Sequence, residues 1–195
     1  MLRALSIAFA CTLAGSLAFA TSALAQTAMD AERIDSQREA LAPLLERMAG
    51  EWRGTAEVRS TQGAMSLVQT ERVGPMLDGS VIVVEGAGYA EDGSRPFNAF
   101  AVIAYDPGSE TYSIRSFANG RYGEYPLWPT EDGFRWEIEA GPATIRYVAT
   151  VDGETWHEVG TYEREGAPPT TFIEMHLTRI GDSDWPAGGA VEPID

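Results

Sequence analysis

Five side chains have the types and positions expected of a site for a small organic molecule: Arg115, Phe117, Trp136, Tyr147 and Met175. Alternation along the predicted strands assigns all five to inward faces, where aromatic rings and a thioether favour apolar contacts. An inward arginine is costly unless it is paired, so we predict that Arg115 binds a carboxylate of the ligand. The alternative interpretation is that these side chains pack a solid core.

A second candidate group is a pair of carboxylates, Glu137 and Glu139, which lie two residues apart on one strand face. Paired carboxylates can carry out acid–base chemistry. Arg146 is expected opposite Glu137, however, and such an ion pair is typical of the polar face of a half-buried strand. We therefore predict no catalytic residue here.

The two histidines do not form a metal-binding motif in the sequence. His157-Glu158 begins like the zinc-protease helix motif, but Thr161 stands where the second histidine is required, and the segment has the pattern of a strand. His176 is expected to face outward together with Glu174. The sequence therefore predicts neither a metal site nor a cofactor.

These candidates lie on short runs rich in β-branched and aromatic residues, separated by turn signals such as Asn119-Gly120 and Asp152-Gly153. This spacing predicts consecutive antiparallel hairpins. No connection is long enough for a crossover helix, which excludes a parallel sheet. The predicted strands are 51–60, 64–74, 80–90, 97–105, 110–118, 121–128, 134–139, 143–151, 155–164 and 170–180.

Ten meandering strands in an open sheet would leave two exposed edges, and closing the sheet into an up-and-down barrel removes both. We therefore predict an all-β, ten-stranded antiparallel barrel. Barrel width grows with strand number, so the interior is expected to hold a cavity of roughly a few hundred cubic ångströms. The hairpin around Gly141-Pro142 has one self-consistent register, with Trp136 opposite Tyr147 and Glu137 opposite Arg146.

The segments outside the barrel have different compositions. Residues 1–25 combine Arg3, an apolar run and the small residues Ala23-Leu24-Ala25, which predicts a secretory signal peptide rather than a membrane anchor. Residues 26–50 are expected to be helical. Residues 51–180 form the barrel domain, and residues 181–195 a flexible tail.

Within the helical segment we expect one helix that ends near Leu41, because Pro43 would break it, and a short turn of helix from Pro43 to Met48.

The composition narrows the class of partner. The chain has 195 residues and a formal net charge of −15, which disfavours nucleic acid and anionic membrane surfaces. Its hydrophobic content of 44% is that of a globular protein and disfavours disorder. Cys11, the single cysteine, lies inside the predicted signal peptide, so the processed protein would be free of thiols, as suits an oxidising compartment.

Residues 45–54 resemble the opening of calycin (lipocalin-like) barrels, in which a short helix leads into a first strand marked Gly-x-Trp. Here that motif is Gly50-Glu51-Trp52. In calycins an arginine or lysine on the last strand lies across the tryptophan, and Arg179 stands at the matching position. The resemblance implies that Trp52 and Arg179 close the base of the barrel, where a stacked guanidinium fills space and satisfies its charge.

A closer resemblance is to an uncharacterised group of bacterial calycin-like proteins, a family of unknown function. It rests on the Gly-x-Trp-x-Gly motif at residues 50–54, the turn Leu77-Asp78-Gly79, the hairpin at residues 104–107 and Thr178-Arg179. The resemblance implies a fold and the calycin habit of holding small apolar molecules, but no activity. Nitrobindin-like calycins bind haem through a histidine near the C-terminus, but the outward position expected for His176 opposes that role.

Together these features predict a periplasmic or secreted barrel that binds a small hydrophobic molecule without catalysis. The first alternative is an isomerase or lyase that acts on a bound lipid or aromatic acid. The second alternative is a structural module with a filled core. The sequence predicts no nucleic-acid partner and no stable membrane insertion, and leaves the oligomeric state open.

Overall fold

The computed structural model describes residues 15–61 and 63–185, in which one long helix is followed by ten strands. A single turn of 3₁₀ helix, Leu77–Gly79, separates the second strand from the third. The elements are α1 (Gly15–Met48), β1 (Gly50–Ser60), β2 (Gly63–Met76), β3 (Val81–Tyr89), β4 (Phe97–Asp106), β5 (Thr111–Ala118), β6 (Arg121–Pro129), β7 (Gly133–Ala140), β8 (Ala143–Val151), β9 (Thr155–Arg164) and β10 (Thr170–Gly181).

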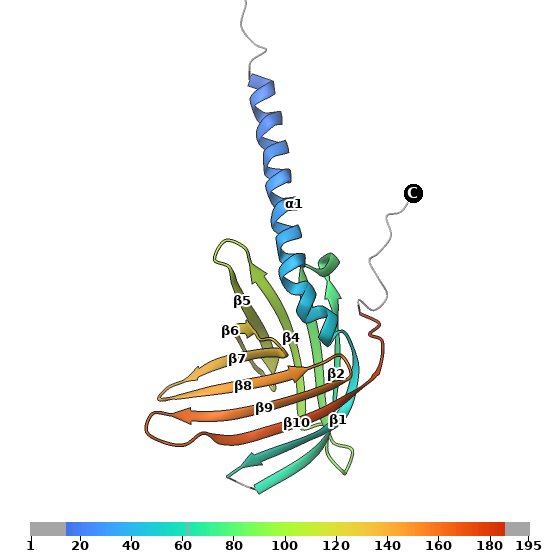
Figure 1. Cartoon of the computed structure of the whole chain (residues 1–195), viewed down its shortest axis with the longest axis vertical. Coiled ribbons are helices and arrows are strands. Elements are labelled where there is room, and N and C mark those ends of the chain that lie inside the picture. The colour runs from blue at the N-terminus through green and yellow to red at the C-terminus, as the bar shows by residue number, and fades with distance from the viewer. Residues whose placement is uncertain (1–14, 62, 186–195) are drawn as a thin grey trace, which may run out of the picture. The chain divides into compact units, whose positions relative to one another are not determined.

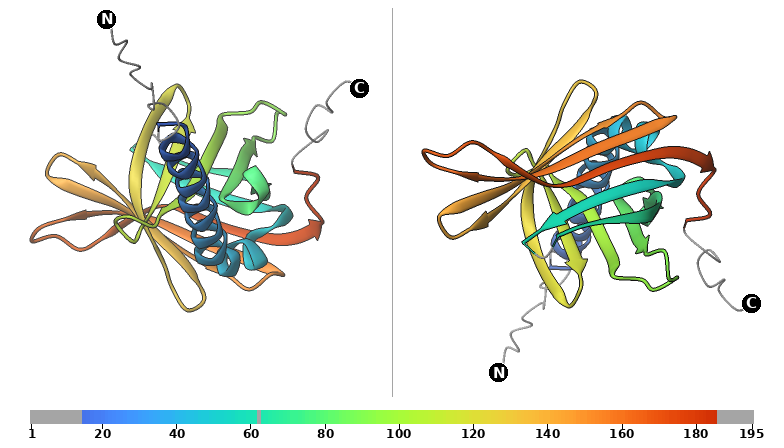
Figure 2. Two further views of the ribbon diagram at one scale, coloured as in Figure 1. Left: turned by 90° about the horizontal axis from the view of Figure 1, so that it is seen from above. Right: turned by 90° about the horizontal axis from the view of Figure 1, so that it is seen from below.

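The strands form a closed antiparallel barrel in which each strand pairs with its neighbours in the sequence. Closure comes from β1, which pairs with β2 on one side and with β10 on the other, so the first and last strands lie side by side (Figure 1). Figure 2 shows the same barrel from above and below. The predicted fold class is therefore confirmed, and every predicted strand overlaps an observed one.

The register of the β7–β8 hairpin is also the predicted one. Trp136 pairs with Tyr147, and Glu137 with Arg146. One face of this hairpin is therefore aromatic and the other carries ion pairs, as the alternation of side chains across a strand requires.

The helix differs from the prediction, because α1 continues through Pro43 to Met48 without a break. A proline inside a helix removes one backbone hydrogen bond, but the tertiary contacts of its last turns hold the helix together. Leu41, Leu44 and Met48 are buried in the barrel core. These contacts outweigh the cost of the proline, so the prediction of two helical pieces is wrong.

The chain divides into two compact units, Met1–Ile34 and Asp35–Asp195. In the first unit, the helix includes the last residues of the predicted signal peptide. Residues 1–14, with Arg3, Cys11 and much of the apolar run, lie outside the described residues, so the processing site stays a prediction. Among the described residues, no helix is both long and apolar enough to span a membrane.

In the second unit, the last turns of α1 pack against one end of the barrel. The Gln37 side chain donates a hydrogen bond to the Tyr105 carbonyl at 3.2 Å, and the Tyr112 hydroxyl donates one to the Ala40 carbonyl at 3.0 Å. These bonds join the helix to β4 and β5 beside the turn of one hairpin, where Tyr105 pairs with Tyr112. Helix and strands therefore share a single core.

The C-terminal segment is ordered further than expected. Strand β10 runs to Gly181, Asp184 forms an ion pair with Arg72 at 2.9 Å, and the Trp185 ring lies 6.5 Å from that of Phe100. Asp184 and Trp185, which belong to the segment predicted as a flexible tail, therefore contact the barrel. Residues 186–195 lie outside the described part of the chain.

Candidate functional site

The barrel interior contains a cavity of about 180 Å³ that is partly open to solvent. The cavity is smaller than the predicted few hundred cubic ångströms because large aromatic side chains occupy part of the interior. It is lined mainly by apolar side chains: Met48, Val84, Phe97, Ala99, Ala101, Ile103, Ile114, Ala118, Phe134, Trp136, Tyr147, Trp156, Ile173 and Met175, together with the polar residues Gln69, Glu71, Ser116 and Glu158.

Three of the residues predicted to contact a ligand lie on this wall. Trp136 and Tyr147 stack face to face, with ring centroids 4.1 Å apart and planes 3° apart. Met175, on β10, is buried and lines the same cavity. Burial raises the pKa of the Tyr147 hydroxyl, which stays protonated throughout the neutral range.

The inward orientation predicted for the other two residues is wrong, because Arg115 and Phe117 lie on the outer face of β5. The Arg115 side chain is exposed and forms an ion pair with Glu124 on β6. The Phe117 ring is 44% exposed and stacks on Tyr122. The inward face of β5 carries Ile114 instead, since apolar residues occur on both faces of this strand and their alternation alone does not identify the inner one.

Two carboxyl groups that the sequence analysis did not select face the cavity. Glu71 lies on β2, and its Oε1 accepts a hydrogen bond of 2.7 Å from the Gln69 amide. Glu158 lies on β9, and its Oε2 accepts one of 3.1 Å from the Trp156 indole. The cavity therefore combines apolar walls with two acidic groups.

The residues of β3 that face these polar side chains leave room for them. A Cβ atom on Gly86 would lie 2.6 Å from Glu71 Oε2, and a Cβ on Gly88 would lie 2.9 Å from Gln69 Oε1. A Cβ atom essentially never comes this close to another heavy atom, so glycine is required here if the polar side chains are to keep their positions. The Gly86-Ala87-Gly88 run therefore makes space inside the barrel.

Burial controls the charge of both carboxyl groups. Removal from water raises the pKa of Glu71 to about 8, and the neighbouring charge of Glu158 raises it further against the opposing effect of the Gln69 hydrogen bond. Burial likewise raises the pKa of Glu158. Glu71 is consequently protonated at neutral pH and can donate a hydrogen bond into the cavity.

The base of the barrel brings together the two residues singled out by the calycin resemblance. The β1–β10 ladder places Trp52 directly opposite Arg179. The Trp52 indole donates a hydrogen bond of 2.9 Å to the Met48 carbonyl and meets Trp156 edge-on, with ring centroids 5.7 Å apart. The Arg179 guanidinium donates to the Ala49 carbonyl at 3.3 Å, which joins β10 to the end of the helix.

Glu137, the first of the two candidate carboxylates on β7, belongs to an ion-pair network, as expected. Glu137 Oε1 accepts hydrogen bonds from Arg146 at 2.8 Å and from Arg135 at 3.1 Å. Arg146 also pairs with Glu163 on β9. Glu137 lies on the face of β7 opposite to that of Trp136 and does not line the cavity.

The period of two along each strand is the signal that could have found the buried carboxyl groups. Gln69 and Glu71 alternate with outward residues between the buried Leu67 and Val73, and Glu158 follows the buried Trp156 by two positions. A polar side chain in phase with core residues is predicted to face inward. A short spacing between acids on one strand does not reveal this pair, because Glu71 and Glu158 come from separate strands.

No protein-family model and no curated protein matches the sequence. Among solved structures, the chain is similar to the crystal structure of Rv2717c from M. tuberculosis, with a TM-score of 0.54 and 14% sequence identity. The similarity covers 74% of this chain and 97% of that chain. At this identity the likeness concerns the fold alone.

Proposed function

We propose that the barrel binds a small, uncharged and largely apolar molecule in its interior cavity. The observation that carries this proposal is the aromatic-lined cavity of about 180 Å³, with a protonated carboxyl group in its wall. Interior clefts with apolar walls and a few polar groups are the usual form of a small-molecule site.

The size of the cavity limits the ligand. Typical ligand pockets measure roughly 300–1,000 Å³. An apolar cavity of about 150 Å³ is known to stay dry and to bind benzene. The present cavity therefore suits a single aromatic ring or a short branched chain rather than a long lipid.

The polar groups of the cavity limit the charge of the ligand. Among the described residues, those that line the cavity include two glutamates and no arginine. A carboxylate ligand would meet acidic groups without a cation to pair with, so an aromatic acid is disfavoured. A carbonyl or hydroxyl group fits better, because it could accept a hydrogen bond from the protonated Glu71.

We expect 4-fluorotoluene, followed by fluorine NMR, to bind at one site per chain. Trp136→Ala removes one wall of the cavity and should weaken this binding about tenfold, which corresponds to about 1.4 kcal/mol. Trp128→Ala is the matched control, because Trp128 lies on the outer face under the Arg135 guanidinium. Equal effects of the two substitutions, or no binding to the wild type, would contradict interior binding.

One observation favours a second candidate function, an isomerase or lyase on the same barrel. A carboxyl group with a pKa of about 8, next to a second buried carboxyl group, is suited to general acid–base catalysis near neutral pH. If the protein is such an enzyme, a small molecule extracted from the natively purified protein should exchange carbon-bound hydrogen for deuterium when it is incubated with the wild type in D₂O. Glu71→Gln should stop the exchange without preventing binding. Unchanged exchange in this variant would exclude Glu71 as the acid or base.

We further propose that the protein acts in the periplasm or is secreted, on the basis of the signal-peptide pattern of residues 1–25. N-terminal sequencing of exported protein should begin at Gln26. Recovery of the chain with Met1 at its start, from the cytosol alone, would contradict this localisation.

A further inference from the structure

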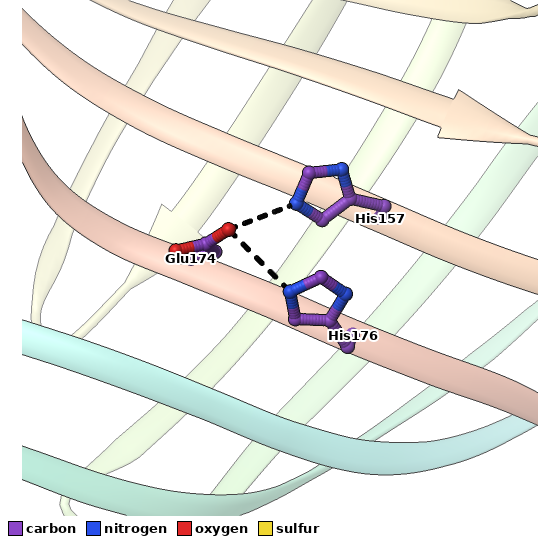
Figure 3. Close-up of side chains that lie close together, drawn as sticks. All are labelled: His157, Glu174 and His176. Atoms are coloured by element: carbon purple, nitrogen blue, oxygen red, sulfur yellow. Dashed lines mark hydrogen bonds and ion pairs between the residues drawn. The ribbon is translucent and has the colours of Figure 1, made fainter.

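A cluster of three metal-ligating side chains lies on the outer face of the barrel, away from the cavity. His157 comes from β9, and Glu174 and His176 come from β10 (Figure 3). The β9–β10 ladder pairs His157 directly with His176, and Glu174 precedes His176 by two residues on the same face. The topology thus brings together residues that are far apart in the sequence.

The ligand atoms of the cluster converge on one point. His157 Nε2 lies 3.2 Å and His176 Nε2 lies 3.4 Å from the same oxygen, Oε1 of Glu174. The two imidazole rings are stacked, with centroids 4.3 Å apart and planes 16° apart, so both Nε2 atoms point to the same side (Figure 3). All three ligand atoms lie within 4.8 Å of one another.

These distances match the geometry of a zinc site. A tetrahedral zinc ion with bonds of about 2.0–2.1 Å holds neighbouring ligand atoms roughly 3.3–3.4 Å apart. The separations of 3.2 and 3.4 Å between each histidine Nε2 and Glu174 Oε1 are close to that value. Two histidines and one glutamate are also a donor set that zinc uses in proteins.

The surroundings leave the site accessible. The side chains of His157 and His176 are 44% and 61% exposed, so a fourth coordination position would open to water. The net charge of −15 attracts cations to the surface in general. Arg59 brings a positive charge to the cluster, since its guanidinium lies 3.9 Å from the other oxygen, Oε2, of Glu174. That contact leaves Oε1 directed at the histidines.

From this convergence we infer that His157, Glu174 and His176 bind one divalent zinc ion, with the fourth position open to water or to an external ligand. The site is independent of the interior cavity and of the function proposed for it. No metal site was predicted here because the two histidines lack the spacing of a helical zinc motif; the pairing of β9 with β10 brings them together instead.

The test uses the full chain, stripped of metal with a chelator and titrated with zinc chloride. His157 and His176 are the only histidines of the protein, so the imidazole carbon-bound proton signals in NMR report on this site alone. We expect both sets of signals to shift together and to saturate at one equivalent of zinc. Signals that stay unchanged at one equivalent would overturn the inference without any substitution.

Calorimetric titrations of three variants complete the test. His157→Gln and His176→Gln should each weaken zinc binding at least tenfold, whereas Glu139→Gln, an exposed acid on β7, should leave it unchanged. Thermal unfolding of each variant checks that the barrel is intact. If both histidine variants bind zinc as tightly as the wild type, the ion binds to the acidic surface in general. That result would overturn the inferred site.

Discussion

The substitution Glu71→Gln is expected to change the free energy of unfolding by different amounts at different pH values. Its effect at pH 9 should be more stabilising than its effect at pH 4.5 by roughly 3–5 kcal/mol. The pKa of Glu71 is about 8 in the folded protein, compared with 4.5 for a glutamate in the unfolded chain. Between these values the folded state keeps a proton that the unfolded chain has lost, so the wild-type free energy of unfolding falls as the pH rises. Each pH unit costs about 1.4 kcal/mol, and the loss levels off above pH 8.

Urea unfolding of the wild type and of Glu71→Gln from pH 4.5 to pH 9 measures this difference. The variant keeps an acceptor for the Gln69 amide, since a glutamine oxygen can take the place of Glu71 Oε1. Glu139→Gln is the control, because Glu139 is an exposed acid on β7 that does not contribute to the pKa shift of Glu71. Parallel profiles for the wild type and Glu71→Gln would mean that Glu71 is ionised and solvated in the folded protein.

Replacing Trp52 by alanine is expected to lower the free energy of unfolding by about 3–5 kcal/mol, the usual cost of truncating a large buried aromatic residue. The Trp52 side chain is only 1% exposed and packs against Trp156 at the base of the barrel. The substitution also leaves the Met48 carbonyl without its indole donor. This loss should occur whether or not Trp52 contacts a ligand.

The exposed Trp128 provides the comparison for Trp52 as well, because Trp128→Ala removes the same side chain from the surface. Its effect on the free energy of unfolding should stay below about 1 kcal/mol. Denaturant unfolding of both variants gives the two values directly. A near-neutral Trp52→Ala would contradict the account of the barrel base.

The strands could be predicted because turn signals and β-branched runs recur along the whole chain and agree with one another. The β7–β8 register followed from a single hairpin, since only one pairing puts Trp136 opposite Tyr147 and Glu137 opposite Arg146. Local sequence determines both features. The continuous helix was missed because the buried contacts of Leu41 oppose the local effect of Pro43.

The site was harder to predict because it is assembled across the barrel. Arg115 was assigned to the inner face, but β5 carries apolar residues on both faces, and the ion pair with Glu124 satisfies Arg115 outside. Glu71 and Glu158 lie on strands that are not neighbours, so no spacing in the sequence links them. The pairing of strands around the closed barrel determines which side chains face one another. Closure depends on pairing between strands that are far apart in the sequence.

The most direct test of interior binding is a native mass spectrum of the protein saturated with 4-fluorotoluene. The account predicts one bound molecule per chain in the wild type and none in Ala99→Phe, whose added ring fills the cavity. Ala64→Phe, an exposed position on β2, should bind like the wild type, and equal thermal midpoints would show that both variants are folded. A wild-type spectrum without the bound molecule, or one bound molecule in folded Ala99→Phe, would contradict the interior site.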